Sequence, residues 1–363
     1  MKFDNNTPYE AGRYVVQDEK GKDLLIIVVK ATYEFNHDGS LTISDKQEKV
    51  ELADQYFGDS ETTGIKYASD VTYGKKSSDI ALIGHAVAMK EKTKKSYVIF
   101  NVGKIRKKIA VFGDRYWQSI LGVTKISSPE RFTKIPLVYE NCFGGRDLST
   151  KKEKHHEFET GNYIGTGLKA KKSKLKIKEI KLPNLEDPDN LIKSLKDRPK
   201  PTGLGFINPN WEPRLGFAGT YDENWQKNKM PLLPDDFNTK VNHAAHPDLI
   251  YPGFLKGGEE VLIAGVSKKG PFKFNIPVIK PECRVEITGE GSISHKMNIE
   301  KLVINSDEKN AVLVWNCSID VHNKLYEVQN IECRMKDEAN VEDEAEVENE
   351  AKVENEAKVE NES

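Results

Sequence analysis

The chain has 363 residues and a formal net charge of −2, from 55 Lys and Arg against 57 Asp and Glu. This total hides an imbalance: Val341–Ser363 carries ten acidic residues and two lysines, which leaves 53 basic and 47 acidic residues in positions 1–340. A body charge of +6 over that length is too dilute to indicate a nucleic-acid partner. The longest aliphatic run, Leu24–Val29, is far shorter than the ~20 residues of a membrane-spanning helix, so we expect no membrane insertion.

The cysteines and the first residues indicate the compartment. The four cysteines form no CxxC pair and are scattered along the chain, a pattern that favours reduced thiols over a disulfide framework. Met1–Asn6 leads into no apolar segment, so we expect no secretory signal peptide. Together these features predict a cytoplasmic protein.

Residues 1–150 predict a β-rich region. The apolar run Leu24–Phe35, the turn residues Asp38-Gly39 and the short run Leu41–Ile43 indicate a hairpin. Further strands are expected at Asp79–Met89, Ser96–Val102 and Ile109–Phe112. No long stretch has helical periodicity, so the predicted fold is mainly β, with antiparallel sandwich-like or barrel-like sheets and few short helices.

Residues 151–200 form a charged, Lys-rich connecting segment with seven lysines between Lys169 and Lys181. Within it, Lys174–Lys178 alternates between lysine and an apolar residue, as an edge strand with outward lysines does. A basic docking patch is the other interpretation of this run. Glu186–Leu195 predicts a short helix capped by Asp187 or Asp189.

Residues 201–335 predict a loop-plus-β region that packs on the first. Many prolines between residues 199 and 277 exclude long helices and central strands, and the accompanying aromatic residues indicate an ordered loop structure instead. The β pattern returns at Val261–Val266, Arg284–Thr288, Leu302–Asn305 and Ala311–Val321.

Residues 336–363 form an acidic tail with a six-residue repeat. Valine recurs at positions 341, 347, 353 and 359, between Glu, Asn, Ala and Lys. One valine per six residues cannot bury a core, so we predict a disordered tail whose removal leaves folding intact.

The sequence has no motif that indicates a nucleotide, a nucleophilic serine or a zinc protease site, and we expect no cofactor. The closest approach to a metal cluster is His243 with His246, near Asp235 and Asp236. Pro247 follows directly and disfavours the helical turn that would bring the two imidazoles together. Hydrogen-bonded structural histidines are the alternative to a metal site.

The densest unusual feature combines aromatic, acidic and Arg residues with prolines in the loop region. Such residues build a rigid loop core, and Trp, Tyr and Arg also dominate the contact energy of protein interfaces. Both roles are open here. The candidate partner-binding residues are Trp211, Arg214, Tyr221, Asp222, Trp225 and Asp236.

Several separate motifs bring a family resemblance over roughly residues 8–280. In chain order, the landmarks are Asp70-Val71 with Lys75, Asp79–Ala86, Val111–Trp117, Ile135–Asp147, Leu182–Glu186, Arg198–Gly205, Trp211–Arg214, Gly219–Asp222, Trp225, Pro231–Phe237 and Gly257–Glu259. Their order resembles that of an uncharacterised-domain family encoded beside spike genes in bacterial type VI secretion clusters and implicated as effector adaptors or chaperones.

The resemblance implies a non-enzymatic adaptor that binds a secreted effector protein and helps load it onto the spike, a PAAR-repeat protein on a VgrG trimer. It implies no catalytic residues, and a cytoplasmic location with at most transient association with the spike. Two other functions are open. One is a metal-dependent hydrolase delivered as an effector, through His243 and His246, and the other is a structural accessory that travels with the spike.

Overall fold

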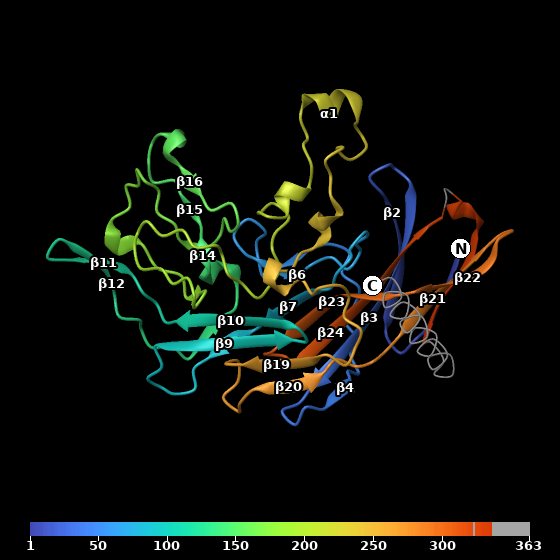
Figure 1. Cartoon of the computed structure of the whole chain (residues 1–363), viewed down its shortest axis with the longest axis horizontal. Helices are drawn as coiled ribbons and strands as arrows, with labels where there is room; N and C mark the ends of the chain where they lie inside the picture. Colours follow the sequence, from blue (N-terminus) through green and yellow to red (C-terminus); the bar gives the residue numbers. More distant parts are fainter. Residues whose placement is uncertain (322–323, 336–363) are drawn as a thin grey trace, which may run out of the picture. The chain divides into compact units, whose positions relative to one another are not determined.

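The computed structural model describes residues 1–321 and 324–335, and this part of the chain is mainly β, which confirms the predicted fold class (Figure 1). The strands are β1 (Lys2–Asn6), β2 (Glu10–Gln17), β3 (Asp23–Phe35), β4 (Leu41–Ile43), β5 (Gln55–Tyr56), β6 (Ile65–Tyr67), β7 (Asp79–Ile83), β8 (His85–Val87), β9 (Lys95–Val102), β10 (Ile105–Phe112), β11 (Trp117–Ile120), β12 (Val123–Ile126), β13 (Lys134–Pro136), β14 (Phe143–Gly144), β15 (Arg146–Asp147), β16 (Glu157–Phe158), β17 (Thr166–Gly167), β18 (Leu185–Glu186), β19 (Glu260–Ala264), β20 (Phe272–Asn275), β21 (Pro281–Ile287), β22 (Gly291–Lys296), β23 (Asn298–Asn305), β24 (Asn310–Asp320) and β25 (Val328–Met335).

Helical structure is confined to short segments. Within the described residues there is one α-helix, α1 (Glu223–Asn228), and none of the helices is long and apolar enough to cross a membrane. The 3₁₀ helices are η1 (Tyr139–Asn141), η2 (Glu153–His155), η3 (Ile177–Glu179), η4 (Leu215–Phe217), η5 (Thr239–Asn242), η6 (Pro247–Leu249) and η7 (Leu325–Glu327). The predicted acidic tail lies outside the described residues.

The chain forms two compact units. The smaller unit comprises Met1–Pro8, Ile279–Met297 and the described residues from Tyr326 onward. Its sheet has the order β1-β25-β21-β22, with β1 parallel to β25 and the other pairs antiparallel. Side chains of β21 alternate between buried and exposed, as expected for a strand with one face on a core.

The larger unit, Tyr9–Val278 with Asn298–Leu325, is built on a sheet of order β2-β3-β24-β23-β7. Strand β3 is fully buried from Leu25 to Val29, and β24 pairs with it along nearly its whole length. A continuous apolar run of this kind is typical of a strand covered on both faces. Strand β7 joins the edge in parallel with β23, so this sheet is mixed rather than purely antiparallel.

The two faces of β3 have different covers. On one side, Phe35 packs against Phe272 and Phe274 of β20, with ring centroids 4.9 and 5.0 Å apart, so the five-stranded sheet β18-β10-β9-β19-β20 lies against this face. On the other side, Phe206 and Ala244 of the Pro-rich loops join the core formed by β3, β7, β23 and β24. The predicted ordered loop structure is therefore present, and it covers a sheet.

Three local predictions were wrong. The run 79–89 is not one strand, because the chain turns at Gly84 (φ +135°), where a Cβ would lie 2.1 Å from Ser306 Oγ. The alternating lysine run is not an edge strand, since it ends in η3, whose Glu179 accepts a hydrogen bond from the backbone N–H of Lys176.

The predicted helix at 186–195 is absent as well. Glu186 belongs to β18, which pairs with β10. Pro188 biases Asp187 away from helical backbone, and Asp187 instead accepts a hydrogen bond from the backbone N–H of Asp189 in a turn.

Candidate functional site

Residues 219–236 leave the loop region as a projecting arm that carries α1 at its tip (Figure 1). Thr220 and Asp236 hold its two ends together: the Thr220 backbone N–H donates to Asp236 Oδ1 at 2.9 Å, and its hydroxyl donates to Oδ2 at 2.7 Å. Gly219 has φ +90° and approaches Pro234 so closely that a Cβ would lie 2.9 Å from it. The base of the arm is therefore fixed on both sides.

The helix in the arm follows from its sequence. Asp222 caps α1 by accepting a hydrogen bond from the Trp225 backbone N–H at 2.8 Å. Pro231 then prevents the helix from continuing, and the Trp225 indole N–H donates to the Leu232 carbonyl oxygen at 2.9 Å. The rings of Tyr221 and Trp225 meet edge to face, with centroids 4.7 Å apart. These contacts give a small element its own internal support.

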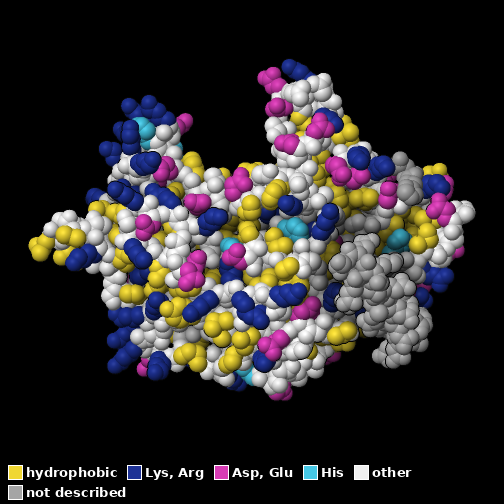
Figure 2. Space-filling view, in the orientation of Figure 1, with side chains coloured by type: hydrophobic (Ala, Val, Ile, Leu, Met, Phe, Trp, Pro, Cys, Tyr) yellow, Lys and Arg dark blue, Asp and Glu magenta, His cyan; other side chains and the backbone are white. Residues whose placement is uncertain are grey.

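The arm presents apolar side chains to solvent. The exposed fractions are 52% for Tyr221, 61% for Met230 and 38% for Leu232. Figure 2 shows hydrophobic and charged side chains side by side on the projection at the top of the view. Exposed apolar groups that cluster on one ordered element are a feature of interaction sites.

The two remaining candidate residues lie in the body rather than on the arm. Trp211 is 3% exposed and meets the Tyr139 ring edge to face at 5.6 Å. Arg214 donates from Nε to the Val241 carbonyl at 2.9 Å and from Nη1 to the Ile207 carbonyl at 2.6 Å. Trp211 therefore belongs to the loop core, and Arg214 joins two loop segments. The structure does not bring all six candidates onto one surface.

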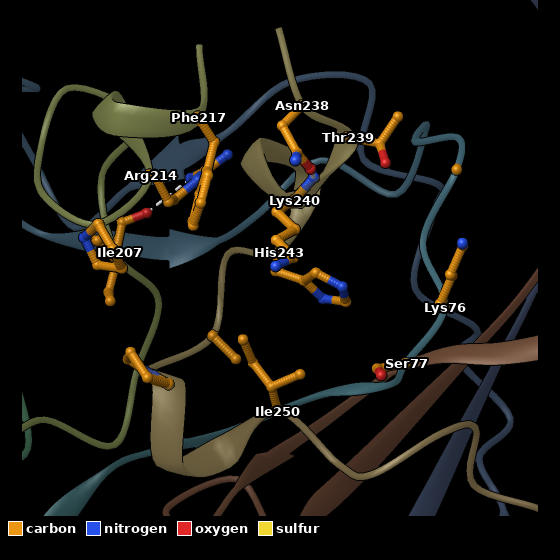
Figure 3. Close-up of a pocket in the computed structure, with 14 residues that line it drawn as sticks. Lys76, Ser77, Ile207, Arg214, Phe217, Asn238, Thr239, Lys240, His243 and Ile250 are labelled. Carbon is orange, nitrogen blue, oxygen red and sulfur yellow. Dashed lines mark hydrogen bonds between the residues drawn. The ribbon is translucent and has the colours of Figure 1, made fainter. Parts of the chain in front are cut away.

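A cavity of about 520 Å³ opens near the base of the arm (Figure 3). Its walls come from the loop after β6, from η4 and η5, and from the start of η6. Apolar groups of Ile207, Phe217 and Ile250 form much of the lining, and Arg214 contributes to it. In the close-up, the His243 ring points into the hollow.

The buried carboxylate of Asp79 orients the His243 ring. Its Nδ1 donates to Asp79 Oδ1 at 2.7 Å, while Asp79 Oδ2 accepts from the Ala244 backbone N–H at 2.8 Å and from Lys75 Nζ at 2.9 Å. Burial alone would raise the pKa of Asp79, but Lys75 and His243 outweigh it and hold this pKa well below its ordinary range. Because Nδ1 carries the donated proton, Nε2 of a neutral His243 is an acceptor.

The residues of the possible metal cluster make separate contacts. His246 Nδ1 lies 3.2 Å from Lys107 Nζ and accepts from the Asp248 backbone N–H at 3.1 Å. Asp235 pairs with Lys229 and Asp236 holds Thr220. Within residues 1–321 and 324–335, no three His, Cys, Asp or Glu side chains are grouped so that they could hold a metal ion.

Several landmark residues of the sequence form buried ion pairs. Asp70 accepts from Lys30 Nζ at 2.9 Å, from Lys301 Nζ at 2.7 Å and from the Glu51 backbone N–H at 2.8 Å. Breaking such a pair leaves an uncompensated buried charge, which is strongly destabilising. Asp70, one of the landmarks, therefore acts in the fold rather than at a surface.

Sequence reasoning missed five polar residues that line the cavity: Lys76, Ser77, Asn238, Thr239 and Lys240. No local pattern sets them apart, because they come from two segments that only the fold brings together. The nearest signal in the sequence was Lys75, one of the family landmarks, which directly precedes Lys76.

The arm and the cavity are the two candidate sites of this mainly β protein. The family described as "Uncharacterized protein conserved in bacteria" (DUF2169) matches residues 20–316, so the chain belongs to it. This range contains the whole arm and every residue that lines the cavity. No curated protein and no solved structure matches the chain significantly.

Proposed function

We propose that the protein is an adaptor or chaperone that binds a type VI secretion effector and helps load it onto the PAAR/VgrG spike. The observation that carries protein binding is the arm, which exposes Tyr221, Met230 and Leu232 on a fixed base. Aromatic and apolar anchors held in one conformation bring contact area at low entropic cost. The secretion setting rests on the ordered landmarks of the sequence.

Binding by the arm is a matter of surface complementarity. The arm inserts its apolar side chains into a pocket or groove of the effector and covers apolar surface there. The two hydrogen bonds from Thr220 to Asp236, called the clasp below, keep the arm from collapsing onto the body. No chemical step is required of the adaptor.

The test is co-purification with the effector encoded beside this gene, followed by the affinity of arm variants. Tyr221→Ser combined with Leu232→Ser removes two exposed anchors, and we expect at least a tenfold loss of affinity together with loss of effector secretion. Leu52→Ser is the matched control, since Leu52 is 64% exposed and lies outside the arm. If the wild-type protein forms no complex with the effector or its PAAR partner, the proposal fails.

Two further measurements separate the alternatives. If the protein is instead a hydrolytic effector, it should be toxic when expressed in a target cell, and His243→Ala should abolish that toxicity. A structural accessory appears in the culture supernatant with the spike, whereas a loading adaptor stays in the producing cell.

A further inference from the structure

The cavity near the arm is rich in hydrogen-bond donors and carries positive charge. Lys76 and Lys240 are exposed at its rim, and neither has an acidic partner within the described residues. None of the described residues that line the cavity is Asp or Glu. The charge of Asp79, behind His243, is compensated by buried Lys75. The cavity therefore favours an anion.

The neutral polar groups strengthen this preference. The hydroxyl groups of Ser77 and Thr239 make no hydrogen bond to other described residues, and each can donate a proton. His243 keeps its Nδ1 on Asp79, so Nε2 is the ring nitrogen left for contact with a ligand. In Figure 3, Lys76, Ser77 and Thr239 lie on one side of the hollow, with the His243 ring directed toward it.

The opposite wall is largely apolar, apart from Arg214, whose guanidinium donates to the Val241 and Ile207 carbonyl oxygens. Ile207 and Phe217 lie across the hollow from Lys76 and Ser77, and Ile250 lies below (Figure 3). The volume of about 520 Å³ is within the usual range of ligand pockets, roughly 300–1,000 Å³. A bare inorganic anion would leave this apolar wall without contacts. The ligand that fits has an anionic group and an apolar group that diverge from one point.

We propose that this cavity receives the free C-terminal carboxylate of a partner polypeptide whose last side chain is apolar. In a C-terminal residue, the carboxylate and the side chain leave the same Cα, so one can face Lys76, Ser77 and Lys240 while the other contacts Phe217 and Ile207. Capture of a terminal carboxylate is a recurring mode of peptide recognition. Only the identity of the polypeptide as an effector rests on the proposed function; the chemistry of the cavity does not.

The direct test uses the full chain and a fluorescent pentapeptide of alanine that ends in leucine. We expect a Kd in the micromolar range for the free acid and at least tenfold weaker binding for the same peptide with an amidated C-terminus. Binding of the acid should weaken with added salt, because exposed charges are screened. The assignment would be overturned if the acid and the amide bound equally well, or if no binding occurred at 1 mM peptide. It would also be overturned if inorganic phosphate displaced the acid peptide at a concentration equal to that of the peptide.

Variants locate the site. Lys76→Gln with Lys240→Gln removes both rim charges from exposed positions, so the fold is preserved, and we expect at least a tenfold loss of peptide affinity. Lys90→Gln, an exposed lysine that does not line the cavity, should bind as the wild type does. A double variant with wild-type peptide affinity would refute the site.

The outcome is separable from that of the proposed function. If the effector co-purifies but no peptide binds, the cavity assignment falls and the adaptor proposal stands. If the acid peptide binds selectively but no effector or PAAR protein associates, the reverse holds.

Discussion

Acidification should destabilise the protein through one buried histidine, His246. Its Nδ1 faces the Lys107 ammonium at 3.2 Å and the Asp248 backbone N–H at 3.1 Å, and its Nε2 lies 3.2 Å from the Pro201 carbonyl oxygen. These partners require a neutral ring with the proton on Nε2, because Nδ1 accepts from two donors. Burial first, and then the charge of Lys107, lower the pKa of His246 from 6.5 to about 4, although the Asp248 carboxylate opposes this shift.

The sign and size of the effect follow from linkage. Between pH 6.5 and 4 the unfolded chain binds a proton at residue 246 that the folded chain does not, so the free energy of unfolding falls as pH falls. A pKa lowered from 6.5 to about 4 contributes about 3 kcal/mol to the free energy of unfolding, a contribution that is present in full above pH 6.5 and lost by pH 4.

Urea denaturation of the wild type and of His246→Gln at pH 7.0, 5.5 and 4.5 measures this contribution. Glutamine can accept from Lys107 and donate to the Pro201 carbonyl without titrating, so the variant should lose markedly less stability on acidification. Other histidines contribute equally to both proteins and cancel in the difference. Parallel pH profiles for the two proteins would refute the reasoning.

Three further substitutions test other parts of the structure. Asp236→Ala removes both hydrogen bonds to Thr220, so proteolytic cleavage within residues 219–236 should speed up several-fold with little change in overall melting temperature; unchanged cleavage would contradict the clasp. Asp70→Asn leaves two buried lysines without their shared carboxylate and should cost about 3–5 kcal/mol in urea denaturation, whereas a loss below 1 kcal/mol would argue against the buried network. Leu121 is 99% exposed at φ +50°, a conformation that asparagine tolerates better, so Leu121→Asn should raise the free energy of unfolding by about 1 kcal/mol; destabilisation would count against this account.

The sequence predicts best where a structural signal is local. The continuous apolar run Leu24–Phe35 marked the central strand β3, because only a strand covered on both faces tolerates such a run. The turn at Asp38-Gly39 likewise marked its hairpin with β4. Both depend on residues within a few positions of one another.

The candidate site depends on pairs that no local pattern reveals. Asp79 and His243 meet because β7 and the loop before η6 cover the same part of the core. The histidine pair in the sequence suggested that His243 and His246 act together, but alternation of the backbone sends them to different partners. The arm was visible as an unusual composition, whereas which of its aromatic residues face solvent was decided by packing.

The order of synthesis gives the sheet pairings a further consequence. Lys2 in β1 lies opposite Asn330 in β25, and Leu24 in β3 lies opposite Asp320 in β24. At about 5–20 residues per second, roughly 15–65 s separate the emergence of these partners from the ribosome. During that interval the apolar strand β3 lacks β24, with which it pairs in the sheet, and unpaired apolar strands aggregate readily. A protein proposed to protect another chain before its delivery would itself require protection while it is being made.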